Sequence, residues 1–140
     1  MRNVSNTCVA PTQDPIIQFV ENKRTMRFLN PKRDRFKRVQ VDGCAITNGM
    51  RCDNLLVSAD EQREFFVELK GVDVHKAIDQ LRTTIMALGE YANDRHAFIV
   101  STNVAPSFTS AIQKAQKEFR RKFNAELCVK EIIMEYKLNG

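Results

Sequence analysis

Apolar positions in the middle of the chain form two short runs separated by a polar break. Residues 50–57 and 64–71 each contain a stretch of aliphatic or aromatic side chains, and residues 58–63 between them are small or polar. Two such runs joined by a short polar segment are typical of a β-hairpin. The pattern therefore predicts two antiparallel strands near the centre of the sequence.

Helical periodicity follows this hairpin twice. Asp73 is a candidate N-cap for a first helix, because a carboxylate there can accept hydrogen bonds from the first turn. Ser107 or Thr109 is the corresponding candidate for a second. The first helix is expected to bury one apolar face, formed by Val74, Ala77, Ile78, Leu81, Ile85, Leu88 and Ala92. The second is expected to bury Phe108, Ala111, Ile112, Ala115, Phe119 and Phe123.

The N-terminal part of the chain predicts a further helix over residues 14–28. Asp14 fits an N-cap and Pro15 fits the first helical position. Asn30 precedes a proline, which disfavours helical backbone and is expected to end the helix. Residues 1–13 are expected to be loosely ordered.

The remaining apolar segments predict strands. Residues 35–46 form one strand, and Asn48-Gly49 is a strong signal for a hairpin turn into the next strand, which starts at Met50 or Arg51 and carries Asp53. Residues 97–100 are wholly apolar, as in a strand that is buried on both faces. Residues 127–134 supply the last strand.

The expected element order is helix, three strands, helix, strand, helix, strand. A helix that connects two strands of one sheet implies a right-handed crossover and parallel pairing. The 140 residues are enough for one domain with a hydrophobic core. The sequence therefore predicts a single-domain α/β sandwich, with a mixed sheet of about five strands flanked by helices.

Charged side chains interrupt both strands of the central hairpin. If Val57 pairs with Glu64, Asp53 lies opposite Glu68, and Lys70 projects from the same face as Glu68. Directly opposed carboxylates repel each other unless a cation lies between them, and Mg²⁺ takes oxygen ligands of this kind. This register is an assumption, because a slip of one residue would place the two carboxylates on opposite faces.

These residues resemble the metal site of the PD-(D/E)XK nucleases, the restriction-endonuclease-like superfamily. Asp53, fourteen intervening residues and Glu68-Leu69-Lys70 match its motif, although Cys52 stands where the motif name has proline. The resemblance implies an Mg²⁺- or Mn²⁺-dependent deoxyribonuclease of the restriction-endonuclease-like fold. Asp53, Glu68 and the Leu69 carbonyl would be the metal ligands. Lys70 would orient or deprotonate the attacking water, or neutralise the transition state.

The same resemblance implies two supporting residues. Many members carry a glutamate on the first helix that joins the metal shell, and Glu21 is the candidate here. Several branches place a glutamine on the helix after the motif, and Gln80 occupies such a position. Each also fits an ordinary surface residue. One branch adds a tyrosine four residues later, where this chain has Thr84.

Basic residues cluster between positions 23 and 38, where eight Lys or Arg residues accompany a single acidic residue. The chain carries a net charge of +5, which favours polyanionic partners. Arg33, Arg35, Lys37 and Arg38 are the candidate phosphate ligands, with DNA as the expected partner. In a strand the first three share one side, so Arg38, on the other side with Phe36, is expected to contribute less. The basic face of the second predicted helix either extends this surface or is merely solvated.

The four cysteines, Cys8, Cys44, Cys52 and Cys128, have no zinc-finger or Cys-x-x-Cys spacing, so reduced thiols are expected. The chain has no apolar run long enough to span a bilayer and no signal-peptide pattern, so a cytoplasmic location without a membrane partner is expected.

Two functions remain open from the sequence. The first is a nuclease of the defence, repair or junction-resolving type. A sequence-specific restriction enzyme of this size would need to act as a homodimer. The second is a non-catalytic nucleic-acid-binding or assembly subunit of the same fold.

Overall fold

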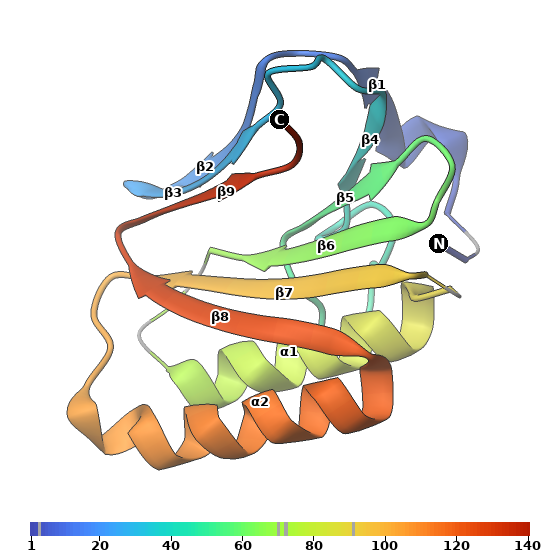
Figure 1. The fold of residues 1–140 in the computed structure, drawn as a ribbon. Coiled ribbons are helices and arrows are strands. Elements are labelled where there is room, and N and C mark those ends of the chain that lie inside the picture. Colours follow the sequence, from blue (N-terminus) through green and yellow to red (C-terminus); the bar gives the residue numbers. More distant parts are fainter. Residues whose placement is uncertain (3, 70, 72, 91) are drawn as a thin grey trace.

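The computed structural model describes residues 1–140 except Asn3, Lys70, Val72 and Tyr91. The chain folds into three layers, with a six-stranded mixed sheet between two helices and a small three-stranded sheet (Figure 1). The central sheet has the order β1-β4-β5-β6-β7-β8 and contains β1 (Val9–Thr12), β4 (Phe36–Gln40), β5 (Asn54–Ser58), β6 (Arg63–Glu68), β7 (Asp94–Ser101) and β8 (Ala125–Glu131). The small sheet contains β2 (Ile16–Glu21), β3 (Arg24–Leu29) and β9 (Ile133–Lys137).

The central hairpin has the predicted register. Strands β5 and β6 are antiparallel and pair Val57 with Glu64 and Asn54 with Val67. Strand β4 pairs antiparallel with β5, so the predicted three-stranded meander is confirmed. Strand β7 pairs parallel with β6, and β8 pairs parallel with β7, as expected for connections that contain helices.

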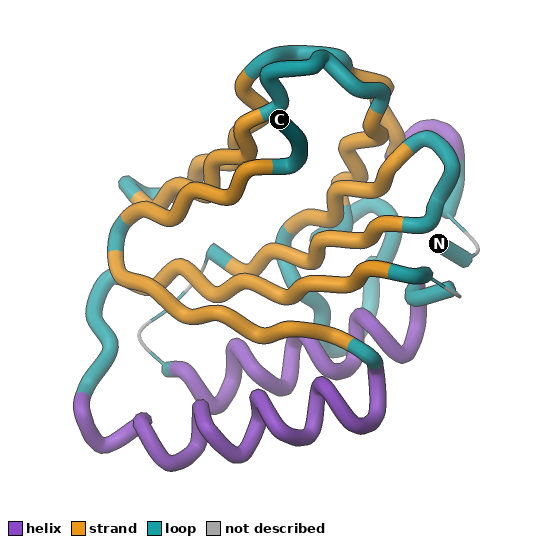
Figure 2. Tube along the Cα trace, in the orientation of Figure 1, coloured by secondary structure: helices purple, strands orange, loops and turns teal. Residues whose placement is uncertain are grey.

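Both helices cover the same face of the central sheet, α1 (Val74–Leu88) against β6 and β7 and α2 (Thr109–Phe123) against β8 (Figure 2). The predicted apolar face of the first helix is buried throughout, including Ala92 just beyond the helix. Asp73 caps α1 by accepting a hydrogen bond from the Lys76 amide, as predicted. In α2 Ala115 and Phe119 are buried, whereas Phe108, Ile112 and Phe123 of the predicted face are only partly buried against the same core.

The predicted N-terminal helix is wrong, because residues 16–29 form the β2–β3 hairpin. Asn22 and Lys23 both have positive φ angles, 48° and 67°, which fits the tight two-residue turn of a hairpin. Ile17 and Phe28 point inward and are fully buried in a second core between the two sheets. Glu21 therefore lies at the end of a strand and not on a helix.

Other strand boundaries also differ from the prediction. The strand expected over residues 35–46 ends at Gln40, and β5 begins only at Asn54, so Asp53 lies in the connecting loop and Asn48-Gly49 does not join two strands directly. Residues 1–13 contain a 3₁₀ turn (η1, Asn6–Cys8) and β1 in place of a loosely ordered segment. The strand expected over residues 127–134 is broken at Ile132, whose φ is 68°, so β9 joins the small sheet next to β3.

The prediction of four reduced cysteines is wrong for one pair. Cys8 and Cys44 form a disulfide with an S–S distance of 2.07 Å, whereas Cys52 and Cys128 are free thiols. The disulfide ties the N-terminal segment to the loop that follows β4. In the described part of the chain, no helix has the length and apolar character needed to cross a membrane.

Candidate functional site

The site predicted from the sequence lies where β5 begins and β6 ends. The Asp53 amide donates a hydrogen bond over 3.1 Å to the carbonyl of Val67, the residue that pairs with Asn54 at the end of the β5–β6 ladder. The Leu69 amide in turn donates to Asp53 Oδ2 over 2.7 Å. Because Leu69 follows Glu68 directly, these bonds hold the Asp53 carboxylate beside the end of β6.

Both predicted carboxylate residues are shielded from solvent. Glu68 has no exposed surface and Asp53 is 6% exposed. They also lie near one thiol, because burial raises the pKa of Cys52 strongly and the negative charges of Glu68 and Asp53 add to that shift. Cys52 is consequently held as a neutral thiol at physiological pH. Both carboxylates therefore lie close enough to the Cys52 side chain to act on its charge.

Helix α1 fixes the loop that carries Asp53. Thr84 Oγ1 accepts a hydrogen bond from the Cys52 amide over 2.7 Å and donates one to the Gln80 carbonyl over 2.8 Å. Thr84 is fully buried, and its hydroxyl connects positions that are 32 residues apart in the chain. This role is not apparent from the sequence, because a threonine inside an amphipathic helix has no pattern that reveals its partner. Gln80 is half-buried, and in the described part of the chain its side chain makes no hydrogen bond.

The end of β7 fixes the segment after the motif. Ser101 is 1% exposed, and its hydroxyl donates to the Gly71 carbonyl over 2.7 Å. Gly71 has a φ of 87°, a left-handed conformation that glycine adopts without strain. The predicted catalytic Lys70 lies outside the described residues, between this anchored glycine and Leu69.

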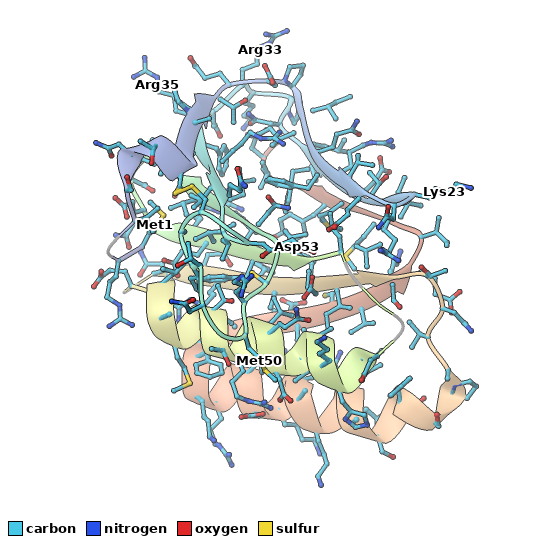
Figure 3. All side chains as sticks on the ribbon, turned by 180° about the vertical axis from the view of Figure 1, so that it is seen from behind. Met1, Lys23, Arg33, Arg35, Met50 and Asp53 are labelled. Atoms are coloured by element: carbon cyan, nitrogen blue, oxygen red, sulfur yellow. A yellow bond between two sulfur atoms is a disulfide. The ribbon has the colours of Figure 1, made fainter. Side chains whose placement is uncertain are left out.

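A pocket of about 480 Å³ opens beside Asp53. Glu21 lines it from the end of β2, and Asp42 lines it from the loop after β4. Arg38 and Phe19 also line this pocket. Figure 3 shows Asp53 near the middle of the molecule, between the small sheet and the helices. Glu68 is not among the lining residues of the pocket.

The four candidate phosphate ligands are not one cluster. Arg38 lies over the Phe19 ring, 4.5 Å from its centroid, and donates to the Gln18 carbonyl over 2.9 Å. Burial lowers the pKa of Arg38, against the opposing effect of the Asp14 charge. Lys37, on the other face of β4, forms a 3.2 Å ion pair with Glu61. Arg33 and Arg35 are exposed at the far end of the molecule from Asp53 (Figure 3).

The donor set is compatible with a divalent cation that keeps part of its hydration shell. Among the residues with a described placement, no group of three or more His, Cys, Asp or Glu side chains is arranged to hold a metal ion. Two carboxylates are nevertheless sufficient for Mg²⁺, which is commonly bound through one or two carboxylates with waters and phosphate oxygens as its other ligands. Asp53 and Glu68 would supply these two. Comparison of the chain with protein-family models, curated proteins and solved structures finds no match.

Proposed function

We propose that this protein is a metal-dependent nuclease that hydrolyses phosphodiester bonds of DNA. The observation that carries the proposal is the hydrogen bond from the Leu69 amide to Asp53 Oδ2, which holds one carboxylate beside the buried Glu68. Carboxylate oxygens are ligands that Mg²⁺ prefers, and the ion is commonly bound through one or two carboxylates.

The order of elements supports the same proposal. From β4 to β8 the chain runs through three antiparallel strands, a helix, a parallel strand, a second helix and another parallel strand. This is the order expected for the restriction-endonuclease-like fold, without its first helix. In its place the β2–β3 hairpin brings Glu21 to the pocket beside Asp53.

In a nuclease of this kind, each candidate residue would have a separate role. Asp53 and Glu68, with the Leu69 carbonyl, would hold Mg²⁺ or Mn²⁺. Such an ion lowers the pKa of a bound water and stabilises the negative charge that develops on a phosphate. Lys70 would orient or deprotonate the attacking water. Arg38, which keeps its guanidinium at the pocket, would bind a phosphate of the DNA backbone.

The direct experiment incubates the purified protein with supercoiled, linear, single-stranded and branched DNA in Mg²⁺, Mn²⁺ or EDTA. We expect cleavage only with a divalent cation. Glu68→Gln should reduce the cleavage rate by more than about 100-fold, because even the loss of a residue that only supports a metal ligand costs ~10–100-fold. Glu126→Gln makes the same chemical change at an exposed position of β8 and should cleave like wild type. Full activity of Glu68→Gln would refute the assigned site.

One observation favours the alternative, a non-catalytic nucleic-acid-binding subunit. Glu68 is fully buried and does not line the pocket, as expected for a carboxylate with a structural role. This alternative predicts DNA binding that is equal in Mg²⁺ and in EDTA, with no cleavage of any of the four substrates. The same set of incubations therefore separates the two functions.

A further inference from the structure

A second pocket is lined by residues of both helices. The helices form the layer that faces away from the small sheet (Figure 1). It has a volume of about 480 Å³, and its lining includes His75 and Arg82 of α1 and Lys114, Lys117 and Arg121 of α2. The small side chains of Ala111 and Ala115 also line it. These alanines leave room between the helices for a ligand to approach the basic side chains.

Acidic groups in this groove are already bound within the protein. Glu118 accepts two hydrogen bonds from Arg82, at 2.9 and 2.7 Å, and also lies 3.6 Å from Lys122. Asp79 binds the same Arg82 guanidinium. The hydrogen bonds from Arg82 lower the pKa of Glu118, so this carboxylate stays charged and engaged at neutral pH. Neither acid is therefore available to neutralise the remaining cations of α2.

Lys114, Lys117 and Arg121 are exposed, and within the described residues they have no ion-pair partner. They occupy positions i, i+3 and i+7 of α2 and so share one face of the helix. At a rise of about 1.5 Å per residue, they span ~10 Å along the axis. Arg120 adds a fourth exposed cation on the neighbouring face. A basic stripe along a helix is the electrostatic footprint of a nucleic-acid backbone.

We propose that the α1–α2 groove binds the phosphate backbone of duplex DNA. This inference rests on the proposed function in that it names a second contact with the same class of substrate. The contact is separate from the first, because no described residue that lines the groove also lines the pocket beside Asp53. In Figure 3 the helices lie at the opposite end of the molecule from Arg33 and Arg35. DNA bound in the groove would therefore contact residues other than those at the pocket beside Asp53.

The test measures duplex DNA affinity in EDTA as a function of salt, so that cleavage cannot interfere. The groove variant carries Lys114→Gln, Lys117→Gln and Arg121→Gln, which preserve helix propensity. Each lost phosphate contact should reduce the slope of log affinity against log salt by ~0.9, or about 2.7 for the three. Over a fourfold rise in salt, wild type should then lose about 40-fold more affinity than the variant.

A matched control carries Lys23→Gln, Lys130→Gln and Lys137→Gln, which remove the same charge from exposed positions outside the helices. Its slope should equal that of wild type. An unchanged slope in the groove variant would overturn the proposal, and an equal reduction in both variants would reveal only a net-charge effect and overturn it too. Tighter binding of polyglutamate than of DNA would assign the groove to an acidic protein instead. The nuclease proposal is tested by a different result. It would be wrong if Glu68→Gln cleaved DNA as fast as wild type, whatever the salt slope of the groove variant.

Discussion

Replacing Thr84 with valine removes the hydroxyl that holds the loop in front of Asp53. Valine has nearly the same shape, so the change takes away the acceptor of the Cys52 amide without opening a large cavity. The amide is buried, and its hydrogen-bond acceptor in the structure is Thr84 Oγ1, at a distance of 2.7 Å. The substitution therefore leaves a buried N–H group without an acceptor.

The expected loss of folding stability is the cost of leaving the Cys52 N–H group without an acceptor. An unsatisfied buried donor costs about 1–3 kcal/mol of folding free energy. With an unfolding entropy of about 2.1 cal/mol/K per residue, the 140-residue chain has a total near 0.3 kcal/mol/K, so Tm should fall by about 3–10 °C. The displaced loop should also lower the rate of DNA cleavage, because Asp53 follows Cys52 directly.

Urea unfolding and thermal melting of Thr84→Val measure the loss of stability. Thr83→Val is the matched control, because it makes the same change one residue earlier at an exposed position of α1. Its effect should stay within about 0.5 kcal/mol, as for most surface substitutions. Equal stability of Thr84→Val and Thr83→Val would refute the view that this hydroxyl anchors the loop.

Two further predictions concern the disulfide and the basic residues. Cys44→Ser opens a cross-link between positions 36 residues apart, so in non-reducing buffer it should lower the free energy of unfolding by about 4 kcal/mol, and with reductant it should match wild type. Equal urea midpoints without reductant would contradict the pairing. Arg38→Gln should reduce the salt slope of DNA binding by ~0.9, whereas Lys37→Gln should leave it unchanged because Lys37 pairs with Glu61. A larger change for Lys37 would show that the pocket beside Asp53 is not where DNA binds.

The sequence was most informative where hydrophobic periodicity and chain connectivity agreed. The apolar face of α1 and the β5–β6 register were both predicted, the register because a polar loop over residues 58–63 pairs Val57 with Glu64. The Asp53–Glu68 pair expected from that register lies beyond the observed ladder, which ends at Asn54 and Val67, so the metal site stays a prediction.

The N-terminal prediction failed because two periods fit the same residues. Ile16, Ile17, Phe19 and Val20 match a helical face, yet Ile17 and Phe19 also alternate as in a strand. Asp14-Pro15 imitated a helix start, and the turn at Asn22 and Lys23 lacks the glycine that usually marks a tight hairpin. Because this segment was predicted to be a helix, neither the small sheet nor the position of Glu21 at the pocket was predicted.

Long-range polar contacts could not be predicted from the sequence at all. The Thr84–Cys52 and Ser101–Gly71 hydrogen bonds join residues about 30 positions apart. The Cys8–Cys44 disulfide was hidden because spacing alone does not determine cysteine pairing. Such contacts depend on how the elements pack, and only the tertiary structure reveals them.

The most direct test of the central claim asks whether Asp53 and Glu68 share one cation. Thermal melting is measured with and without Mg²⁺ for wild type, Asp53→Asn and the control Glu126→Gln. At a concentration 100-fold above Kd, bound Mg²⁺ should stabilise wild type by about 2.7 kcal/mol, which corresponds to a rise in Tm of ~9 °C. Glu126→Gln should show the same rise and Asp53→Asn none. An equal rise in Asp53→Asn and wild type would show that Mg²⁺ binds elsewhere, and it would contradict the account of this site.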